Sequence, residues 1–211
     1  MAGQLAAVRA WELTQAGATV VIDLGTPSDF ADRHPAGAIS LPFSDKGLGE
    51  RLSSVLAAGT DIILLTESAE HAKSASAQLV GSPFPLVGVI EGGRDDWHLA
   101  GLPVERLAQI KVDDLADLAA SREMVVLDVR EPLEWETGHV PGAELISLGS
   151  LRHHIQSLPR HVPIAVICEA GLRSSTGASI LQAEGFPDVA NVPEGTGGYR
   201  RAGLPLQYVE Q

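Results

Sequence analysis

The residues with the clearest chemical potential lie in the segment I-A-V-I-C-E-A-G-L-R-S-S, which contains the only cysteine of the sequence, Cys168. A thiolate is a strong nucleophile, and its reactivity depends on surroundings that stabilise its negative charge. In this segment an apolar run ends at the cysteine, five residues follow, and a helix is predicted to begin at about Ser174. Arg173 lies at the end of this loop, where its guanidinium could hold an oxyanion through paired hydrogen bonds.

The loop after Cys168 is predicted to surround the sulfur with hydrogen-bond donors. Gly171 permits backbone angles that other residues avoid, so the loop can turn its N–H groups inward. The following helix adds the unpaired N–H groups of its first turn and the positive end of its dipole. An inert buried cysteine is the alternative, but the Gly-x-Arg-Ser tail outweighs it. We predict Cys168 and Arg173 as catalytic residues, with a substrate-binding set of Glu169, Ala170, Gly171, Leu172, Ser174 and Arg130.

Strands and helices are predicted to alternate around this loop. The apolar runs Met124–Leu127 and Val162–Ile167 are typical of strands buried on both faces, as in a parallel sheet. Helices are predicted over Leu148–Leu158 and Ser174–Glu184, the second ending at a glycine. Open α/β sheets place their ligands at the carboxyl ends of central strands, which is where Cys168 would lie.

The chain repeats itself once. The segment Val20–Ala38 recurs as Val125–Ala143 with Asp, Pro, an aromatic residue, His and Gly-Ala at a fixed offset. I-I-L-L-T recurs as I-A-V-I-C, and E-G-G-R-D-D-W-H-L-A-G-L-P recurs as E-G-T-G-G-Y-R-R-A-G-L-P. Three echoes in one order indicate two homologous α/β domains. We predict domains over residues 1–105 and 106–211, joined near Glu105–Ile110.

Three motifs of the second copy resemble the rhodanese family: the loop C-E-A-G-L-R-S, the segment D-V-R-E-P-L-E-W-E-T-G-H-V-P-G-A and the closing A-G-L-P. The resemblance covers residues 107–205 and, more weakly, residues 5–103. The second copy is also similar to the tandem rhodanese units that occur fused behind metallo-β-lactamase-fold domains. It implies two tandem rhodanese-like domains, each a mostly parallel central sheet flanked by helices. It also implies a sulfurtransferase without a cofactor. Cys168 would take sulfane sulfur from thiosulfate or a low-molecular-weight persulfide and pass it to cyanide or a thiol.

Two features of the loop refine this expectation. Phosphatases and arsenate reductases of the same fold resemble C-x5-R, whereas Cys168 and Arg173 are spaced as C-x4-R, which suits a single sulfur atom. Glu169 stands where the family often has a basic residue. An acid there should oppose thiolate formation and the approach of thiosulfate, so we expect persulfides to load the site better. Tyr199 stands where the family usually has Trp.

The first copy has lost the reactive residues. Thr66 replaces Cys168, and E-S-A-E-H-A replaces E-A-G-L-R-S, so we expect a scaffold or a surface for a protein partner, with a modest ligand pocket at Thr66 as the alternative. The whole chain could then be a sulfur-delivery or binding module instead of a turnover enzyme. Arg130 has Gly25 as its counterpart, which leaves two readings: part of an electropositive mouth or a surface salt bridge.

Residues that recur in both copies are expected to be structural. Asp23 and Asp128 are predicted to anchor loops, and His34 and His139 to form hydrogen bonds. The adjacent pair His153-His154 has no second ligand cluster at a suitable spacing, so no metal site is predicted.

The composition excludes several other classes of function. The formal charge is −12, with 13 acidic against 6 basic residues up to position 105 and 14 against 9 beyond it. Neither half has the basic surface that nucleic acid requires. No apolar run reaches the roughly 18 residues of a membrane span, and no secretory signal is visible. A single cysteine fits a reducing compartment, so a cytoplasmic location is expected.

Overall fold

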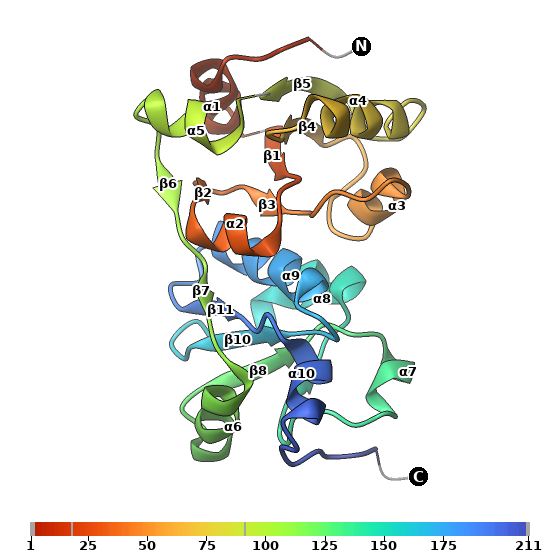
Figure 1. Ribbon diagram of the computed structural model, residues 1–211, viewed down its shortest axis with the longest axis vertical. Coiled ribbons are helices and arrows are strands. Elements are labelled where there is room, and N and C mark those ends of the chain that lie inside the picture. Colours follow the sequence, from red (N-terminus) through yellow and green to blue (C-terminus); the bar gives the residue numbers. More distant parts are fainter. Residues whose placement is uncertain (1–2, 18, 91, 210–211) are drawn as a thin grey trace. The chain divides into compact units, whose positions relative to one another are not determined.

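The computed structural model describes residues 3–17, 19–90 and 92–209. The chain forms two compact units, with the boundary between Arg106 and Leu107 (Figure 1). Glu91, the first residue of the third echo in the first copy, lies outside the described residues. Within the described residues, no helix is both long enough and apolar enough to cross a membrane.

The first unit is built on a four-stranded parallel sheet with the order β3-β1-β4-β5. The strands of this sheet are β1 (Thr19–Asp23), β3 (Ile39–Ser40), β4 (Asp61–Leu65) and β5 (Leu86–Ile90). An antiparallel pair joins β2 (His34–Pro35) to β6 (Val104–Glu105). The helices of this unit are α1 (Ala7–Gln15), α2 (Pro27–Asp32), α3 (Leu48–Ser53), α4 (Ala69–Gln78) and α5 (Gly93–Leu99).

The second unit has a five-stranded parallel sheet with the order β7-β11-β10-β8-β9. Its strands are β7 (Ala108–Gln109), β8 (Val125–Asp128), β9 (Glu144–Leu145), β10 (Ile164–Ile167) and β11 (Val189–Asn191). Its α-helices are α6 (Val112–Ser121), α7 (Pro132–Trp135), α8 (Leu151–His154), α9 (Leu172–Ala183) and α10 (Gly195–Arg201). Two short 3-10 helices, η1 (Leu148–Ser150) and η2 (Ile155–Ser157), flank α8.

The two sheets share one strand order, since β3-β1-β4-β5 corresponds to β9-β8-β10-β11. The pairings beside these strands correspond between the two units as well. Gln4 forms a parallel bridge with Val89 where the second unit has β7, and His139 bridges Gln207 where the first unit pairs β2 with β6. The prediction of two α/β domains with mainly parallel sheets is therefore confirmed.

Strand β10 lies at the centre of the second sheet and is buried along its whole length. One face packs Ala165 and Ile167 against α6 in a cluster that also contains Val192 and Tyr199. The opposite face contacts α9, where Gly177 brings the helix close to Val166. A strand covered on both faces needs apolar side chains at every position, which explains the uninterrupted run I-A-V-I.

Two predicted helix bounds are wrong in detail. The predicted helix Leu148–Leu158 is three short pieces, because the N–H groups of Ser150 and Leu158 bond to carbonyls three residues back, not four. The helix after Cys168 begins at Leu172, two residues earlier than predicted. Arg173 and Ser174 therefore belong to the first turn of α9 and not to the loop.

Candidate active site

The thiol of Cys168 lies at the carboxyl end of the central strand β10, with only 1% of the residue exposed. Its Sγ is 3.3 Å from the hydroxyl oxygen of Ser174, on the first turn of α9. The N–H of Ser175 donates to the carbonyl of Gly171, so the helical hydrogen bonds begin there. The N–H groups just before it have no acceptor within the helix.

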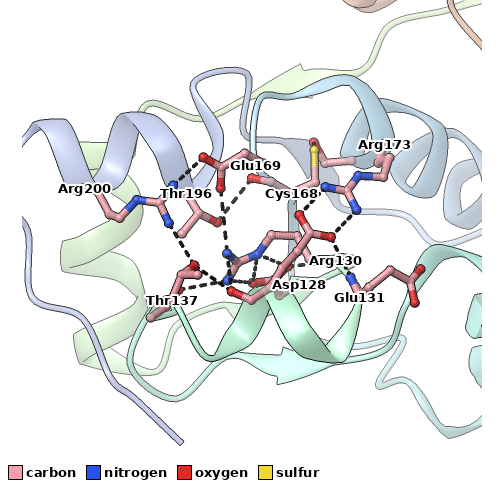
Figure 2. Close-up of polar contacts among 12 residues, drawn as sticks. Asp128, Arg130, Glu131, Thr137, Cys168, Glu169, Arg173, Thr196 and Arg200 are labelled. Carbon is pink, nitrogen blue, oxygen red and sulfur yellow. Dashed lines mark hydrogen bonds and ion pairs between the residues drawn. The ribbon is translucent and has the colours of Figure 1, made fainter.

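The Cys168 loop is fixed from behind by the start of α10. The N–H of Thr196 donates to the carbonyl of Cys168 at 2.7 Å (Figure 2). The N–H of Gly197 donates to the carbonyl of Glu169 at 3.0 Å. The backbones approach so closely that a Cβ on Gly195, whose φ is +61°, would lie 2.4 Å from the Glu169 carbonyl oxygen. The G-T-G-G segment therefore determines where the cysteine backbone lies, a role that the sequence analysis missed.

Gly171 closes the loop from the other side. Its φ is +81°, and a Cβ there would lie 2.3 Å from the carbonyl oxygen of Pro193. Both the backbone angle and the contact require glycine. The loop thus has one fixed path between β10 and α9, with Ala170 exposed at its tip and Leu172 54% exposed at the start of the helix.

Arg173 does not extend toward an open site as the sequence analysis expected. Its two terminal nitrogens donate to the two carboxylate oxygens of Glu134, at 2.6 and 2.7 Å. This paired contact lowers the pKa of Glu134 to about 2 and raises the pKa of Arg173 still further above its ordinary value. Glu134 lies on α7, so the ion pair ties α7 to the first turn of α9.

Arg130 is not a surface salt bridge, because it forms an ion pair with Asp128 and its exposed fraction is 0%. Its guanidinium donates to both carboxylate oxygens of Asp128 and to the carbonyls of Glu134 and Gly138. Asp128 also accepts the backbone N–H of Arg130. A buried guanidinium needs this many acceptors, and it fixes the turn between β8 and α7.

Glu169 is paired, although the sequence analysis treated it as a lone acid beside the sulfur. Its carboxylate accepts a hydrogen bond from Arg200 on α10 and lies 3.8 Å from Arg130 (Figure 2). Arg200 also donates to the hydroxyl of Thr137 at 3.2 Å. A cavity of about 450 Å³ lies beside the loop and is here called the loop cavity. It is lined by Glu134, Thr137, Glu169 and Arg200. The sequence analysis quoted Arg200 within the third echo but gave it no role, because its partner Glu169 is 31 positions away.

The structure thus brings most of the predicted site together. The hydroxyl of Ser174 lies beside the sulfur of Cys168, whereas Arg173, Arg130 and Glu169 each hold a charged partner. Across the described residues, no group of three or more His, Cys, Asp or Glu side chains is arranged to hold a metal ion.

The corresponding place in the first unit is filled by an arginine. Thr66 is buried at the end of β4, and the helix that follows begins at Ala69, which leaves a loop one residue shorter than the loop after Cys168. The guanidinium of Arg94 donates to Asp23 and to Glu67, both at 2.7 Å. Burial raises the pKa of Asp23 to about 6, although Arg94 opposes the rise.

Arg94 takes over in the first unit the contact that Arg130 makes in the second. A Cβ on Gly25, the counterpart of Arg130, would lie 1.8 Å from a terminal nitrogen of Arg94. The guanidinium reaches the same aspartate from α5 instead of from the turn after the strand. The first copy therefore keeps an arginine at this position in space, although the sequence analysis found none in its loop.

Comparison with known proteins places both copies in one family. The profile of the rhodanese-like domain matches residues 6–100 and 111–202. Thiosulfate sulfurtransferase GlpE of Pseudoalteromonas translucida is 30% identical over 86 residues, covering 41% of this chain and 82% of that protein. YrkF of Bacillus subtilis is 39% identical over 70 residues, covering 33% of this chain and 38% of that protein. A rhodanese-related protein structure from Thermoplasma volcanium is similar with a TM-score of 0.46 and 29% identity, covering 48% of this chain and 99% of that chain.

Proposed function

Because this chain belongs to the rhodanese-like domain family, we propose that it is a sulfurtransferase in which Cys168 carries the transferred sulfur as a persulfide. The observation that carries the proposal is the placement of the thiol. Cys168 lies at the carboxyl end of the central strand, within a loop whose path is set by Gly171 and α10, and against the start of a twelve-residue helix. N–H groups at a helix start favour a negatively charged sulfur.

The proposed reaction has two steps, and in each a nucleophile attacks the outer sulfur. In the first, the Cys168 thiolate attacks the outer sulfur of the donor, a new S–S bond forms, and the donor's own bond to that sulfur breaks. The leaving group, sulfite from thiosulfate or a thiolate from an organic persulfide, departs with the electron pair. In the second, a thiol or cyanide attacks the outer sulfur and Cys168 leaves as thiolate. Covalent capture divides one difficult transfer into two easier ones.

Four residues on α9 and α10 have proposed roles in these steps. Ser174 touches the reacting sulfur at 3.3 Å, and its hydroxyl can donate a hydrogen bond to the thiolate. Arg173 adds a positive charge near the sulfur but is held by Glu134, so we propose it as a positioning residue that fixes the first turn of α9. The N–H groups of Thr196 and Gly197 orient the backbone that bears the thiol.

We propose that the first unit has no catalytic role. Thr66 offers no thiol, the loop behind it is shorter, and the guanidinium of Arg94 occupies the space beside Asp23 and Glu67. A modest ligand pocket at Thr66 is disfavoured because the guanidinium of Arg94 already binds Asp23 and Glu67 there. The first unit then serves as a scaffold or as a surface for a protein that delivers or receives sulfur.

The test is the mass of Cys168 after exposure to separate donors. Thiosulfate and an organic persulfide should each add one sulfur atom to the wild-type protein, and Cys168→Ser should abolish the adduct. A matched control places a thiol at the equivalent position of the first unit, as Thr66→Cys in the Cys168→Ser background. This variant should not load, because the first loop is shorter and carries no Gly171 equivalent. Absence of any adduct on wild-type Cys168 would refute the proposal.

Turnover separates an enzyme from a delivery module. Multiple turnovers with a small donor and cyanide or a thiol would establish the enzyme. Loading that is followed by transfer only to a protein acceptor would establish the delivery role. Hydrolysis of an aryl phosphate that is abolished by Cys168→Ser would instead support the phosphatase alternative and contradict sulfur transfer as the main activity.

A further inference from the structure

We propose that the Glu169–Arg200 ion pair makes the site selective for organic persulfides over thiosulfate. This inference rests on the sulfurtransferase function proposed above and adds the substrate class. Glu169 directly follows Cys168, and its carboxylate binds the guanidinium of Arg200 at the loop cavity. Both side chains are partly exposed, at 42% and 33%, so a donor that enters the cavity meets them.

Three guanidinium groups around the Cys168 loop are already paired with a carboxylate. Arg173 holds Glu134, Arg130 holds Asp128, and Arg200 holds Glu169. Two of these carboxylates, Glu134 and Glu169, line the loop cavity, whereas one guanidinium does. The cavity therefore offers a dianion no cation that is not already bound to an acid, in a protein whose formal charge is −12. Thiosulfate binding would require Arg200 to leave Glu169 and would bring two negative charges close to that carboxylate.

An organic persulfide avoids both costs. Its transferable sulfur is attached to another sulfur on a carbon chain, and it carries one negative charge at most on that group. It can place the outer sulfur among the loop N–H groups without breaking the ion pair. The hydrogen bond from Arg200 to Thr137 and the backbone hydrogen bonds between the loop and α10 can stay in place as the persulfide enters. Glu169 is thus a specificity-determining residue, and Arg200 is an anion-binding group that Glu169 keeps engaged.

The alternative is that the ion pair only holds α10 against the loop. In that case its removal would slow every donor alike, because the Cys168 backbone would move. The backbone hydrogen bonds of Thr196 and Gly197 and the close approach of Gly195 hold the same elements together independently. The loop should therefore keep its place when Glu169 loses its charge.

The experiment measures the loading rate of Cys168 with thiosulfate and with cysteine persulfide in four variants of the full chain. Glu169→Gln should raise kcat/KM for thiosulfate about tenfold, the size expected when one charge a few ångströms from a dianion is removed in a wet cavity. Loading by the persulfide should change less than about threefold. Adding Arg200→Gln to Glu169→Gln should remove the gain, and salt should weaken it, because the freed guanidinium attracts the dianion.

The matched control is Glu123→Gln, which changes the net charge equally in the same unit. Glu123 is exposed and precedes β8, at the opposite end of the sheet from the loop, so it should alter neither rate. The inference is overturned if Glu169→Gln leaves the ratio of the two rates unchanged or slows both donors equally. Glu169→Ala repeats the test without the amide. If no donor loads wild-type Cys168, the sulfurtransferase function itself fails, a result distinct from an unchanged ratio.

Discussion

A substitution at Gly195 tests whether α10 determines the position of the reactive cysteine. Gly195 has φ +61°, and a Cβ on it would lie 2.4 Å from the carbonyl oxygen of Glu169 and 2.5 Å from that of Cys168. Both contacts are with backbone, so no side chain can rotate away to relieve them. Alanine at this position must push the Cys168 loop and the start of α10 apart.

The magnitude follows from comparison with Gly203 at the other end of the same helix. Gly203 has φ +71°, but a Cβ there would meet nothing within 4 Å. Alanine at Gly203 should therefore lose only the roughly 1–2 kcal/mol of a left-handed backbone, part of which is offset by the stiffer unfolded chain. Gly195→Ala carries the same backbone cost and adds about 1–3 kcal/mol of overpacking.

The assay combines calorimetry with persulfide loading. We expect Gly203→Ala to load Cys168 at the wild-type rate, and Gly195→Ala to load it at least about tenfold more slowly, since small displacements of a reacting group are costly. The two variants should differ by about 2 kcal/mol in the stability of the second unit. Equal losses of stability together with equal loading rates would refute the conclusion that α10 positions the thiol.

Three further predictions concern ion pairs and the thiol. Because Arg173 lowers the pKa of Glu134 from 4.5 to about 2, this pair should stabilise the fold above pH 4.5 and lose that effect as the pH falls toward 2. Glu134→Gln should then cost about 1 kcal/mol at pH 6, a value reduced for exposure, and almost nothing near pH 2 in urea titrations. Gly25→Arg and Arg94→Thr should each cost about 3 kcal/mol alone, and the double variant should recover at least half of the summed loss in a double-mutant cycle. Ser174→Ala should slow persulfide formation about tenfold in a stopped-flow assay, and an unchanged rate would exclude the hydroxyl from the reaction.

Much of the fold could be predicted because it is written in local patterns. The apolar run I-A-V-I is buried on both faces of the sheet, as its lack of polar alternation indicated. The repeat correctly indicated two similar units, since the same strand order recurs in both sheets. The helix start after Cys168 was wrong by two residues because Gly171, with φ +81°, turns the chain directly into α9. Sequence alone does not report that angle.

The charges around the site could not be predicted, because their partners are far apart in the sequence. Glu169 and Arg200 are separated by 31 positions, and Glu134 and Arg173 by 39. From the sequence, Arg173 could only be recognised as a cation near a thiol and Glu169 as an acid near it. Which acid neutralises which base depends on how α7, α9 and α10 pack, and this pairing leaves Arg173 and Glu169 each bound to an opposite charge.

The first unit shows what a position-by-position comparison of the repeats cannot detect. Gly25 replaces Arg130 in sequence, yet Asp23 still binds a guanidinium, because Arg94 reaches it from α5. An aspartate buried at the end of a central strand needs a cation or a proton, and evolution of either copy can supply that cation from any element within reach. The glycine is then a consequence of the relocated arginine, since any larger residue would collide with it. What the two copies share is therefore a buried carboxylate at the end of a central strand and an arginine that binds it.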